Sequence, residues 1–412
     1  MPGSEIRGSF RYPLVVRWLA FATCAGIAAA IIAPVAGRFA KGAIPADPVL
    51  RARWLEPEAG DNPNKWQKLA FAYVAAKDFI RAPRAFRMSA KYYRESGDVN
   101  GAIQMERGAE KYETDARIYI TRPLEPKDAA RYDTKAKFEP PYGAYLGAFY
   151  MHERKLTRRY YDEVGMRRPY VADFERAVGA RQAIYFHYVG WNKPFPSKWV
   201  ADVKAQGAAV QIAWEPGKLD EVKDDAYVRG FARAARESGV PIFLRYASEM
   251  NGNWTPYHGD PKKYIEKWRL ITQIMREDAP NVAMLWTVFE TPITKIEEYY
   301  PGPEWVDWVG LNVYSVPYFN NDRKQRADWR NPADSVKFVY DLFAARHPIM
   351  IAEYAASHMS SLDMQYRGDV ARTKLSQFYA SLPRLFPRIK AVCWLSMNAI
   401  EFAIPGRQKN NY

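Results

Sequence analysis

The sequence predicts an α/β fold of the (β/α)8 TIM barrel class, preceded by a small all-α region and an apolar N-terminal segment. After residue 140, short apolar runs recur, and helix-length amphipathic stretches such as 227–238 and 261–277 separate most of them. The runs cover residues 143–150, 182–188, 208–214, 242–247, 282–287, 306–313, 349–352 and 389–395. Eight runs in this length suit one barrel. A doubly wound open sheet is the alternative, but no glycine-rich phosphate-binding turn follows any run, so we prefer the barrel.

The N-terminal segment from Trp18 to Gly37 carries no charged residue and is flanked by basic residues. Its length is enough to cross a bilayer and exceeds the usual apolar core of a cleaved signal peptide. The basic excess is slightly greater before the segment, which predicts a signal anchor within residues 1–44, with the N-terminus inside. Cleavage after Ala36 is the alternative and would give a secreted protein. In both cases we expect the remaining chain outside the cytoplasm, in the periplasm or the extracellular space.

Residues 45–138 have a different composition, rich in Ala, Arg, Lys, Glu and Tyr at helical spacing. The spacing predicts two or three helices packed as a small accessory domain. The offsets from Trp66 to Phe86 resemble one tetratricopeptide repeat, but no second copy follows 34 residues later. Docking of a protein partner is one function that such helices would serve. The adjacent prolines Pro140 and Pro141 cannot continue a helix, so we place the barrel domain at residues 139–412.

The formal net charge of +14 is spread thinly along the chain. No basic run is interleaved with aromatic residues, so nucleic acid is not a predicted partner. The N-terminal third is the more basic per residue, which suits an anionic membrane surface. The loop at residues 317–334 follows the sixth run and carries four basic residues. It is either a basic rim for an acidic glycan or an ordinary solvated loop.

Metal and cofactor sites are not predicted. The five histidines are scattered without the spacing of metal ligands, and no His-Glu-x-x-His pair or cysteine cluster occurs. Cys24 lies in the apolar segment and Cys393 in a predicted core strand, so a disulfide between them is not expected.

Carboxylates and aromatic residues recur where the predicted strands end, which is where barrels carry their active sites. Glu249 follows the fourth run and Glu353 ends the seventh, and these strands face each other across a barrel mouth. Two carboxylates about 5 to 5.5 Å apart permit double displacement, in which one protonates the leaving oxygen and the other attacks the anomeric carbon. A gap of roughly 6.5 to 9.5 Å would leave room for water and predict inversion instead.

The residues around Glu249 fit a sugar. Trp254 offers a flat apolar face to a pyranose, and Asn251 offers hydrogen-bond partners for hydroxyl groups. Arg245 precedes Glu249 by four residues and has the same strand parity, so we expect it to point into the barrel and to keep Glu353 ionised. Further candidates for sugar contact at strand ends, each with core packing as the alternative, are Trp191, Trp286 and Trp394.

The string Arg-Tyr-Ala-Ser-Glu-Met-Asn-Gly-Asn-Trp at 245–254 resembles the strand-four signature of glycoside hydrolase family 26, the β-mannanase family within clan A of retaining glycosidases. Ile-Ala-Glu-Tyr at 351–354 resembles its nucleophile segment, and Gly-Leu-Asn-Val-Tyr at 310–314 its strand-six segment. The resemblance covers residues 141 to about 402. It implies Glu249 as acid/base, Glu353 as nucleophile and Tyr314 as the group that orients the nucleophile. It also implies that Trp254 and Trp394 line the subsite of the reacting sugar.

One position departs from the family pattern. Ser248 stands where the family has a histidine, and its shorter side chain cannot reach the same sugar hydroxyl. Ser248 is still a candidate for substrate binding, but mannan is a less favoured substrate. We therefore expect a retaining endo-β-glycanase acting on another β-linked polysaccharide, such as a bacterial exopolysaccharide. The alternative is a non-catalytic glycan-binding component of an assembly that makes or exports envelope polysaccharide.

Overall fold

The computed structural model describes residues 45–76, 78, 81–113, 119–120, 136–141, 143–319, 322–397 and 410–411. Within these ranges no helix is both long enough and apolar enough to span a membrane. The apolar segment Trp18–Gly37 lies outside the described residues, so the anchor and its alternative, a cleaved signal peptide, stay predictions.

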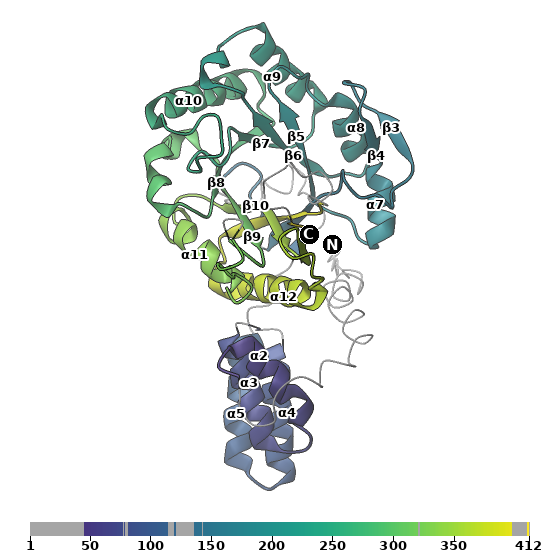
Figure 1. Cartoon of the computed structure of the whole chain (residues 1–412), viewed down its shortest axis with the longest axis vertical. Helices are drawn as coiled ribbons and strands as arrows, with labels where there is room; N and C mark the ends of the chain where they lie inside the picture. Colours follow the sequence, from purple (N-terminus) through teal and green to yellow (C-terminus); the bar gives the residue numbers. More distant parts are fainter. Residues whose placement is uncertain are drawn as a thin grey trace, which may run out of the picture. The chain divides into compact units, whose positions relative to one another are not determined.

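Eight parallel strands form a closed barrel in the order of the sequence (Figure 1), and each predicted apolar run is confirmed as one of them. The strands are β2 (Ala144–Phe149), β5 (Ile184–Gly190), β6 (Ala209–Glu215), β7 (Ile242–Tyr246), β8 (Val282–Phe289), β9 (Trp308–Ser315), β10 (Ile349–Ala356) and β12 (Ile389–Leu395). Strand β2 pairs with β12 on one side and β5 on the other, which closes the ring. A short strand, β1 (Tyr119–Ile120), also pairs with β2.

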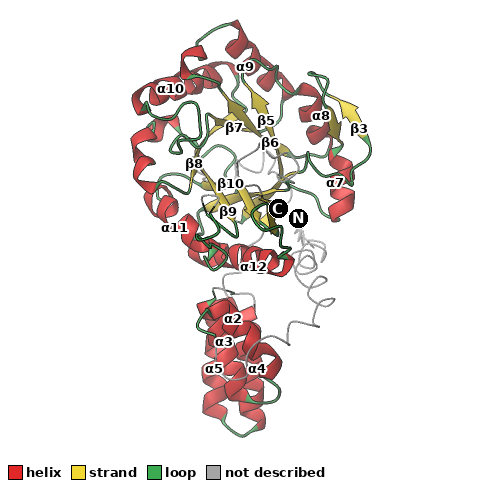
Figure 2. Ribbon diagram, viewed as in Figure 1, coloured by secondary structure: helices red, strands yellow, loops and turns green. Residues whose placement is uncertain are grey.

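Helices surround the strands (Figure 2). They are α7 (Val171–Val178), α8 (Ser197–Ala205), α9 (Ala226–Ser238), α10 (Pro261–Asp278), α11 (Pro332–Phe343) and α12 (Gly368–Leu385). Local sequence sets their ends: the side chains of Asp225, Asp260 and Asn331 accept the first backbone amides of α9, α10 and α11. The segment from β8 to β9 has only 3-10 turns, at Ile293–Lys295, Glu297–Tyr299 and Pro303–Trp305. The expected α/β alternation is therefore confirmed except at this connection.

Two small elements decorate the strand-to-helix loops. The hairpin of β3 (Arg159–Tyr161) and β4 (Arg167–Pro169) lies between β2 and α7. Strand β11 (Met359–Ser360) follows β10 and pairs with β13 (Asn410–Asn411).

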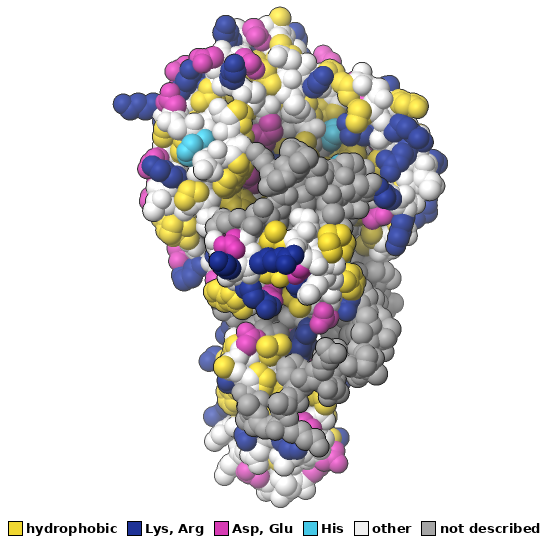
Figure 3. All heavy atoms as spheres, viewed as in Figure 1, with side chains coloured by type: hydrophobic (Ala, Val, Ile, Leu, Met, Phe, Trp, Pro, Cys, Tyr) yellow, Lys and Arg dark blue, Asp and Glu magenta, His cyan; other side chains and the backbone are white. Residues whose placement is uncertain are grey.

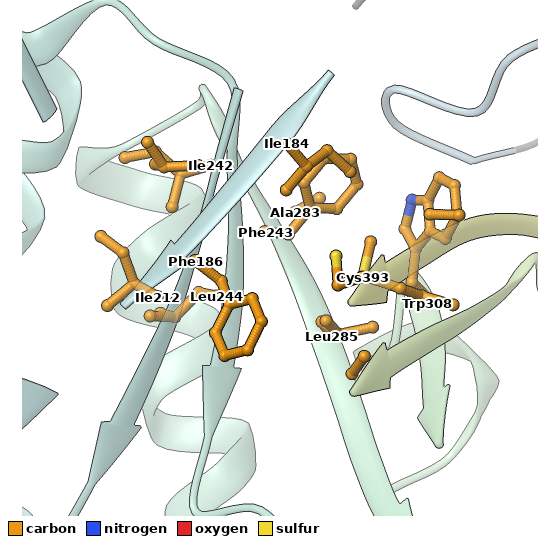
Figure 4. Packing of buried hydrophobic residues seen from close by; sticks show 14 of the residues in the cluster. Ile184, Phe186, Ile212, Ile242, Phe243, Leu244, Ala283, Leu285, Trp308 and Cys393 are labelled. Carbon is orange, nitrogen blue, oxygen red and sulfur yellow. The ribbon is translucent and has the colours of Figure 1, made fainter. Parts of the chain in front are cut away.

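Large apolar side chains fill the barrel core, as the close view in Figure 4 shows. Parallel strands that are covered on both faces read as continuous apolar runs, which is why the sequence located them. Most residues of the eight strands are buried. Side chains that act on a ligand are therefore expected at the rim where the strands end.

Cys393 lies inside this packed core and is completely buried. Its Sγ is 3.8 Å from the side-chain oxygen of Gln211, and burial raises the pKa of the thiol. Gly147 of β2 makes room for it, because a Cβ at that position would lie 2.6 Å from the sulfur. The two residues are paired neighbours on β12 and β2.

Residues 48–113 form helices with a hydrophobic cluster of their own. The helices are α2 (Pro48–Leu55), the 3-10 turn η2 (Glu56–Glu58), α3 (Pro63–Ala75), α4 (Arg81–Glu95) and α5 (Val99–Glu113). The cluster includes Leu69, Tyr73, Phe86 and Met105, and a turn at residues 96–98 separates α4 from α5. Helices are thus present in this region, as expected, and they bury apolar residues of their own.

Candidate active site

Glu249 sits in a tight turn directly after β7. Its backbone amide donates to the carbonyl of Thr287 on β8, 2.9 Å away. Ala247 and Glu249 both have positive φ angles, +44° and +59°, a backbone region that residues with a Cβ seldom adopt. Such local strain persists only where surrounding contacts enforce it, and it is typical of functional turns.

Glu353 lies within β10 and is 3% exposed. Its carboxylate accepts a hydrogen bond from the hydroxyl of Tyr188 at 2.6 Å and another from the hydroxyl of Tyr314. The guanidinium of Arg245, itself 2% exposed, pairs with it as well. Three donors from three different strands therefore fix this carboxylate, and its oxygens act only as acceptors.

Glu249 has a different environment. Its two oxygens accept from the side-chain amide of Asn312 and the indole N–H of Trp254, each at 2.7 Å. Burial raises the pKa of Glu249, and the negative charge of Glu353 raises it further. The two donors and Arg245 act in the opposite direction without cancelling this effect. Glu249 therefore holds its proton to higher pH than an ordinary glutamate.

A row of aromatic rings joins the two carboxylates. Trp254 meets Phe289 edge to face at 5.1 Å, and Phe289 lies 5.9 Å from the ring of Tyr314. The first ring donates to Glu249 and the last donates to Glu353. The structure thus brings five predicted residues together at one rim: Glu249, Glu353, Tyr314, Arg245 and Trp254. Trp254 is 45% exposed, so its face is open to a ligand.

Ser248 takes part in a buried network beside this pair. Its hydroxyl donates to Glu215 at 2.6 Å and its backbone amide donates to the other oxygen of Glu215 at 3.1 Å. The hydroxyl of Tyr257 also donates to Glu215, at 2.6 Å. Burial raises the pKa of Glu215, although Arg245 and these donors oppose it. The hydroxyl of Ser248 is used in its bond to Glu215, which contradicts the expectation that it binds substrate; Ser248 instead anchors the turn that carries Glu249.

Asn251 is a second correction. Its side chain is fully buried and engages the next loop, with Nδ2 donating to the carbonyl of Phe289 at 2.9 Å and Oδ1 accepting its amide at 3.0 Å. These bonds use the groups that a sugar hydroxyl would need. Asn251 therefore fixes the loop and does not bind sugar.

Trp286 is also a core residue. It is fully buried, and its ring packs against Tyr300 and Phe343 at 5.3 and 5.4 Å. Phe343 belongs to α11, so the indole faces the helix layer rather than the barrel mouth. The expected sugar contact is wrong because Trp286 has the outward parity on its strand.

Trp191 and Trp394 are half-buried, and each packs against other aromatic rings. Trp191 lies on Trp214 at 4.6 Å, and that ring stacks on Phe231 of α9. Trp394 lies 6.2 Å from the ring of Tyr354, which stacks on α12. These ring contacts lie toward the helices, and sugar contact by Trp191 and Trp394 stays a prediction.

Several residues of the site were given no role in the sequence analysis: Tyr188, Asn312, Glu215 and Tyr257. The first three lie at or near the ends of predicted strands, so strand parity at the rim could have identified them. Tyr257 had no such signal, because it reaches Glu215 from within an irregular loop.

In the part of the chain that the structure describes, no group of three or more His, Cys, Asp or Glu side chains could hold a metal ion. The chemistry that this rim supports is proton transfer and nucleophilic attack by two carboxylates in unequal environments.

Comparison with known proteins finds one family model and several relatives that are similar to part of this chain. Residues 217–337 match the model of glycosyl hydrolase family 26, a stretch that includes Glu249 and Tyr314 and ends before Glu353. Endoglucanase H of Acetivibrio thermocellus is 26% identical over 249 residues, covering 55% of this chain and 26% of that protein. Beta-1,3-xylanase TXYA of a Vibrio species is 25% identical over 162 residues, covering 37% of this chain and 35% of that protein. This chain thus spans about a third or less of these relatives.

Among solved structures, a family 26 β-mannanase from Bacteroides ovatus aligns with a TM-score of 0.40 and 13% identity. The alignment covers 61% of this chain and 80% of that one.

Proposed function

This chain is similar to glycoside hydrolase family 26. On that basis we propose that it is a retaining endo-β-glycanase, which cleaves a β-linked polysaccharide by double displacement. The observation that carries the proposal is the unequal pair at the rim. Glu249 has a raised pKa, while Glu353 is surrounded by three donors. A protonated acid opposite an acceptor-only carboxylate is the arrangement that glycoside cleavage requires.

In the first step the carboxyl of Glu249 gives its proton to the glycosidic oxygen while the carboxylate of Glu353 attacks the anomeric carbon. The bond to the leaving sugar breaks, and a covalent glycosyl ester forms on Glu353. In the second step Glu249, now ionised, takes a proton from water. That water attacks the anomeric carbon and releases Glu353.

Three side chains prepare Glu353 for attack. Arg245, Tyr188 and Tyr314 hold its oxygens in one orientation and so reduce the reorganisation needed during reaction. Asn312 and Trp254 do the same for Glu249. The exposed face of Trp254 would stack on the sugar next to the cleaved bond.

The substrate is proposed to be a β-linked polymer other than mannan, such as a bacterial exopolysaccharide. Ser248 replaces the histidine of the family pattern, and its hydroxyl is bonded to Glu215, which leaves it no donor for a sugar. The relatives named above carry the names of a glucanase and a xylanase, and another, from Bifidobacterium adolescentis, is named a mannan endo-1,4-beta-mannosidase. We further propose that the segment Trp18–Gly37 anchors the enzyme with its barrel outside the cytoplasm.

The test uses the full chain in detergent with hydroxyethylcellulose, β-1,3-xylan, β-1,4-mannan and alginate as substrates. Release of reducing ends should disappear in Glu249→Gln and in Glu353→Ala, and should persist in the matched control Glu237→Gln on the exposed side of α9. Nuclear magnetic resonance of the first product should show the β anomer. Normal turnover by either variant at the rim would reject the proposal, and an initial α product would reject retention.

The alternative is a glycan-binding component without catalysis, with the helical region docking a protein partner. The departure at Ser248 favours it, because an altered rim could keep binding after losing its original substrate. Binding of a polysaccharide by the wild-type chain with no new reducing ends would support this alternative.

A further inference from the structure

The exposed aromatic side chains of the barrel share one location. Among its described residues, those with large exposure are Tyr161, Trp254, Trp329 and Tyr366. They lie in the loops that follow β2, β7, β9 and β10, all on the rim that carries the carboxylates. Aromatic side chains commonly line the sites where proteins bind ligands. Trp254 is already assigned to the reacting sugar, and Tyr161 lies in the separate hairpin of β3 and β4. Trp329 and Tyr366 remain without an assigned function, on the neighbouring connections after β9 and β10.

Trp329 is the more exposed indole, at 68%, and yet it is held in place. Its ring N–H donates to the carbonyl of Arg326 at 2.7 Å. The loop around it is also ordered: the amide of Ala327 donates to Pro317 at 2.8 Å, and that of Phe319 donates to Gln325 at 2.9 Å. An indole with its N–H satisfied and its face open needs little ordering when a ligand binds.

Tyr366 belongs to the next loop and is 73% exposed. Its ring meets His358 edge to face at 5.6 Å. The two loops are tied together because Asp363 accepts from the hydroxyl of Tyr318 at 2.6 Å, and Arg367 donates to the same hydroxyl at 3.3 Å. Arg323 also donates to the carbonyl of Leu362. Trp329 and Tyr366 are thus presented by one cross-linked pair of loops, which we call the outer platform (described residues 317–319, 322–331 and 357–367).

The charges of the outer platform decide which polymer it fits. The two loops carry five basic residues and three acidic ones, and Glu290 adds a fourth carboxylate beneath them. Arg326, Arg330 and Arg367 each pair with a carboxylate. Over α12, basic and acidic side chains lie next to one another (Figure 3). The expected basic rim is therefore largely neutralised, and a polyanion would gain little from it.

We propose that Trp329 and Tyr366 form a sugar-binding subsite for neutral pyranose units of a polysaccharide, beyond the unit that reacts. The inference rests on the proposed function for its position in catalysis, since β9 and β10 carry Tyr314 and Glu353 into the same rim. Stacking on the two rings extends the bound chain past the catalytic pair, which favours attack within a polymer over attack at its end.

The kinetic experiment compares Trp329→Ala, Tyr366→Ala and the double variant with the wild-type full chain. On the polymer that the enzyme cleaves, each single variant should lower kcat/KM by about tenfold, the usual cost of losing an aromatic anchor. On the aryl glycoside of the same sugar, which is too short to reach the subsite, kcat/KM should change less than about twofold. The matched control is Phe71→Ala, an exposed ring in α3 that should change neither value. Equal losses on both substrates, or none, would overturn the inference.

The binding experiment separates this inference from the proposed function. Affinity electrophoresis of the same variants in a Glu249→Gln background measures retardation by hydroxyethylcellulose, β-1,3-xylan, β-1,4-mannan and alginate. The Glu249→Gln chain should be retarded by at least one neutral polymer, and the double variant should lose this retardation even if no polymer is ever hydrolysed. Stronger retardation by alginate, no retardation by any neutral polymer, or retardation that survives the double substitution would each overturn the inference. Equal melting temperatures should accompany a valid comparison.

Discussion

The buried pair of Arg245 and Glu353 gives the most direct physical test, because it needs no substrate. Arg245 is 2% exposed, pairs with Glu353, feels the charge of Glu215 and lies 5.3 Å from the ring of Tyr188. Arg245→Met keeps most of the volume but removes the only positive charge that these groups share among the described contacts. Breaking a buried pair in this way costs about 3–5 kcal/mol of unfolding free energy.

The measurement is urea unfolding followed by circular dichroism, for Arg245→Met, Glu353→Gln and the double variant. Because the double variant leaves no unmatched charge in the pair, its loss should be smaller than the sum of the single losses by about 1–3 kcal/mol. Arg233→Met, on the exposed side of α9, should change stability by less than about 0.5 kcal/mol. A loss below about 1 kcal/mol for Arg245→Met, or strictly additive losses, would refute the reasoning that the pair is charged and buried.

Three further predictions concern the rim and the core behind it. Glu249 must be protonated to act as an acid, and burial and Glu353 raise its pKa, so activity should fall only as pH rises past the ordinary glutamate range. Asn312→Leu removes a donor to the charged form and should move this basic limb of kcat/KM to still higher pH; a limb that stays or moves lower would contradict the assignment. Ser248→Ala should cost about 1–2 kcal/mol in urea unfolding through its lost bond to the buried carboxylate below it, and no loss would count against that bond. Trp286→Ala should destabilise by about 3–5 kcal/mol while leaving KM unchanged, whereas a raised KM at unchanged stability would restore it as a sugar contact.

The strands were predictable because both faces of each are covered, which leaves continuous apolar runs in the sequence. The residues at which the strands end were harder to predict. Strand β10 continues to Ala356, four residues past the predicted end, because residues 353–356 keep pairing with β9. The connection from β8 to β9 lacks an α-helix; it contains Pro292, Pro301 and Pro303, which interrupt helical hydrogen bonding.

The positions of Glu249 and Glu353 were predictable because the carboxyl ends of all barrel strands meet at one rim. Whether a side chain at a strand end points into the barrel or toward the helices was not predictable. Trp286 and Trp394 are each one residue away from a position that points into the barrel. A shift of one residue along a strand moves the side chain to the opposite face. A register shift within β10, next to Glu353, makes that count still harder to make from sequence.

Loop residues were the hardest to assign. Asn251 and Ser248 have the side chains that sugars bind, but both are consumed by partners far along the chain, Phe289 and Glu215. Such pairing depends on how two loops meet after folding. The composition of a polar loop is the same whether its side chains bind a sugar or bond to another loop.

The thiol of Cys393 gives this barrel an internal reporter. Because the sulfur is sealed between Gly147 and Gln211 and burial disfavours its thiolate, a disulfide reagent such as Ellman's can reach it only when the strands separate. The rate of colour development at this single position would then follow opening of the cylinder itself, with no label to introduce. In a chain with Cys24 replaced by serine, that rate would give a clock for how long the fold survives in heat or denaturant.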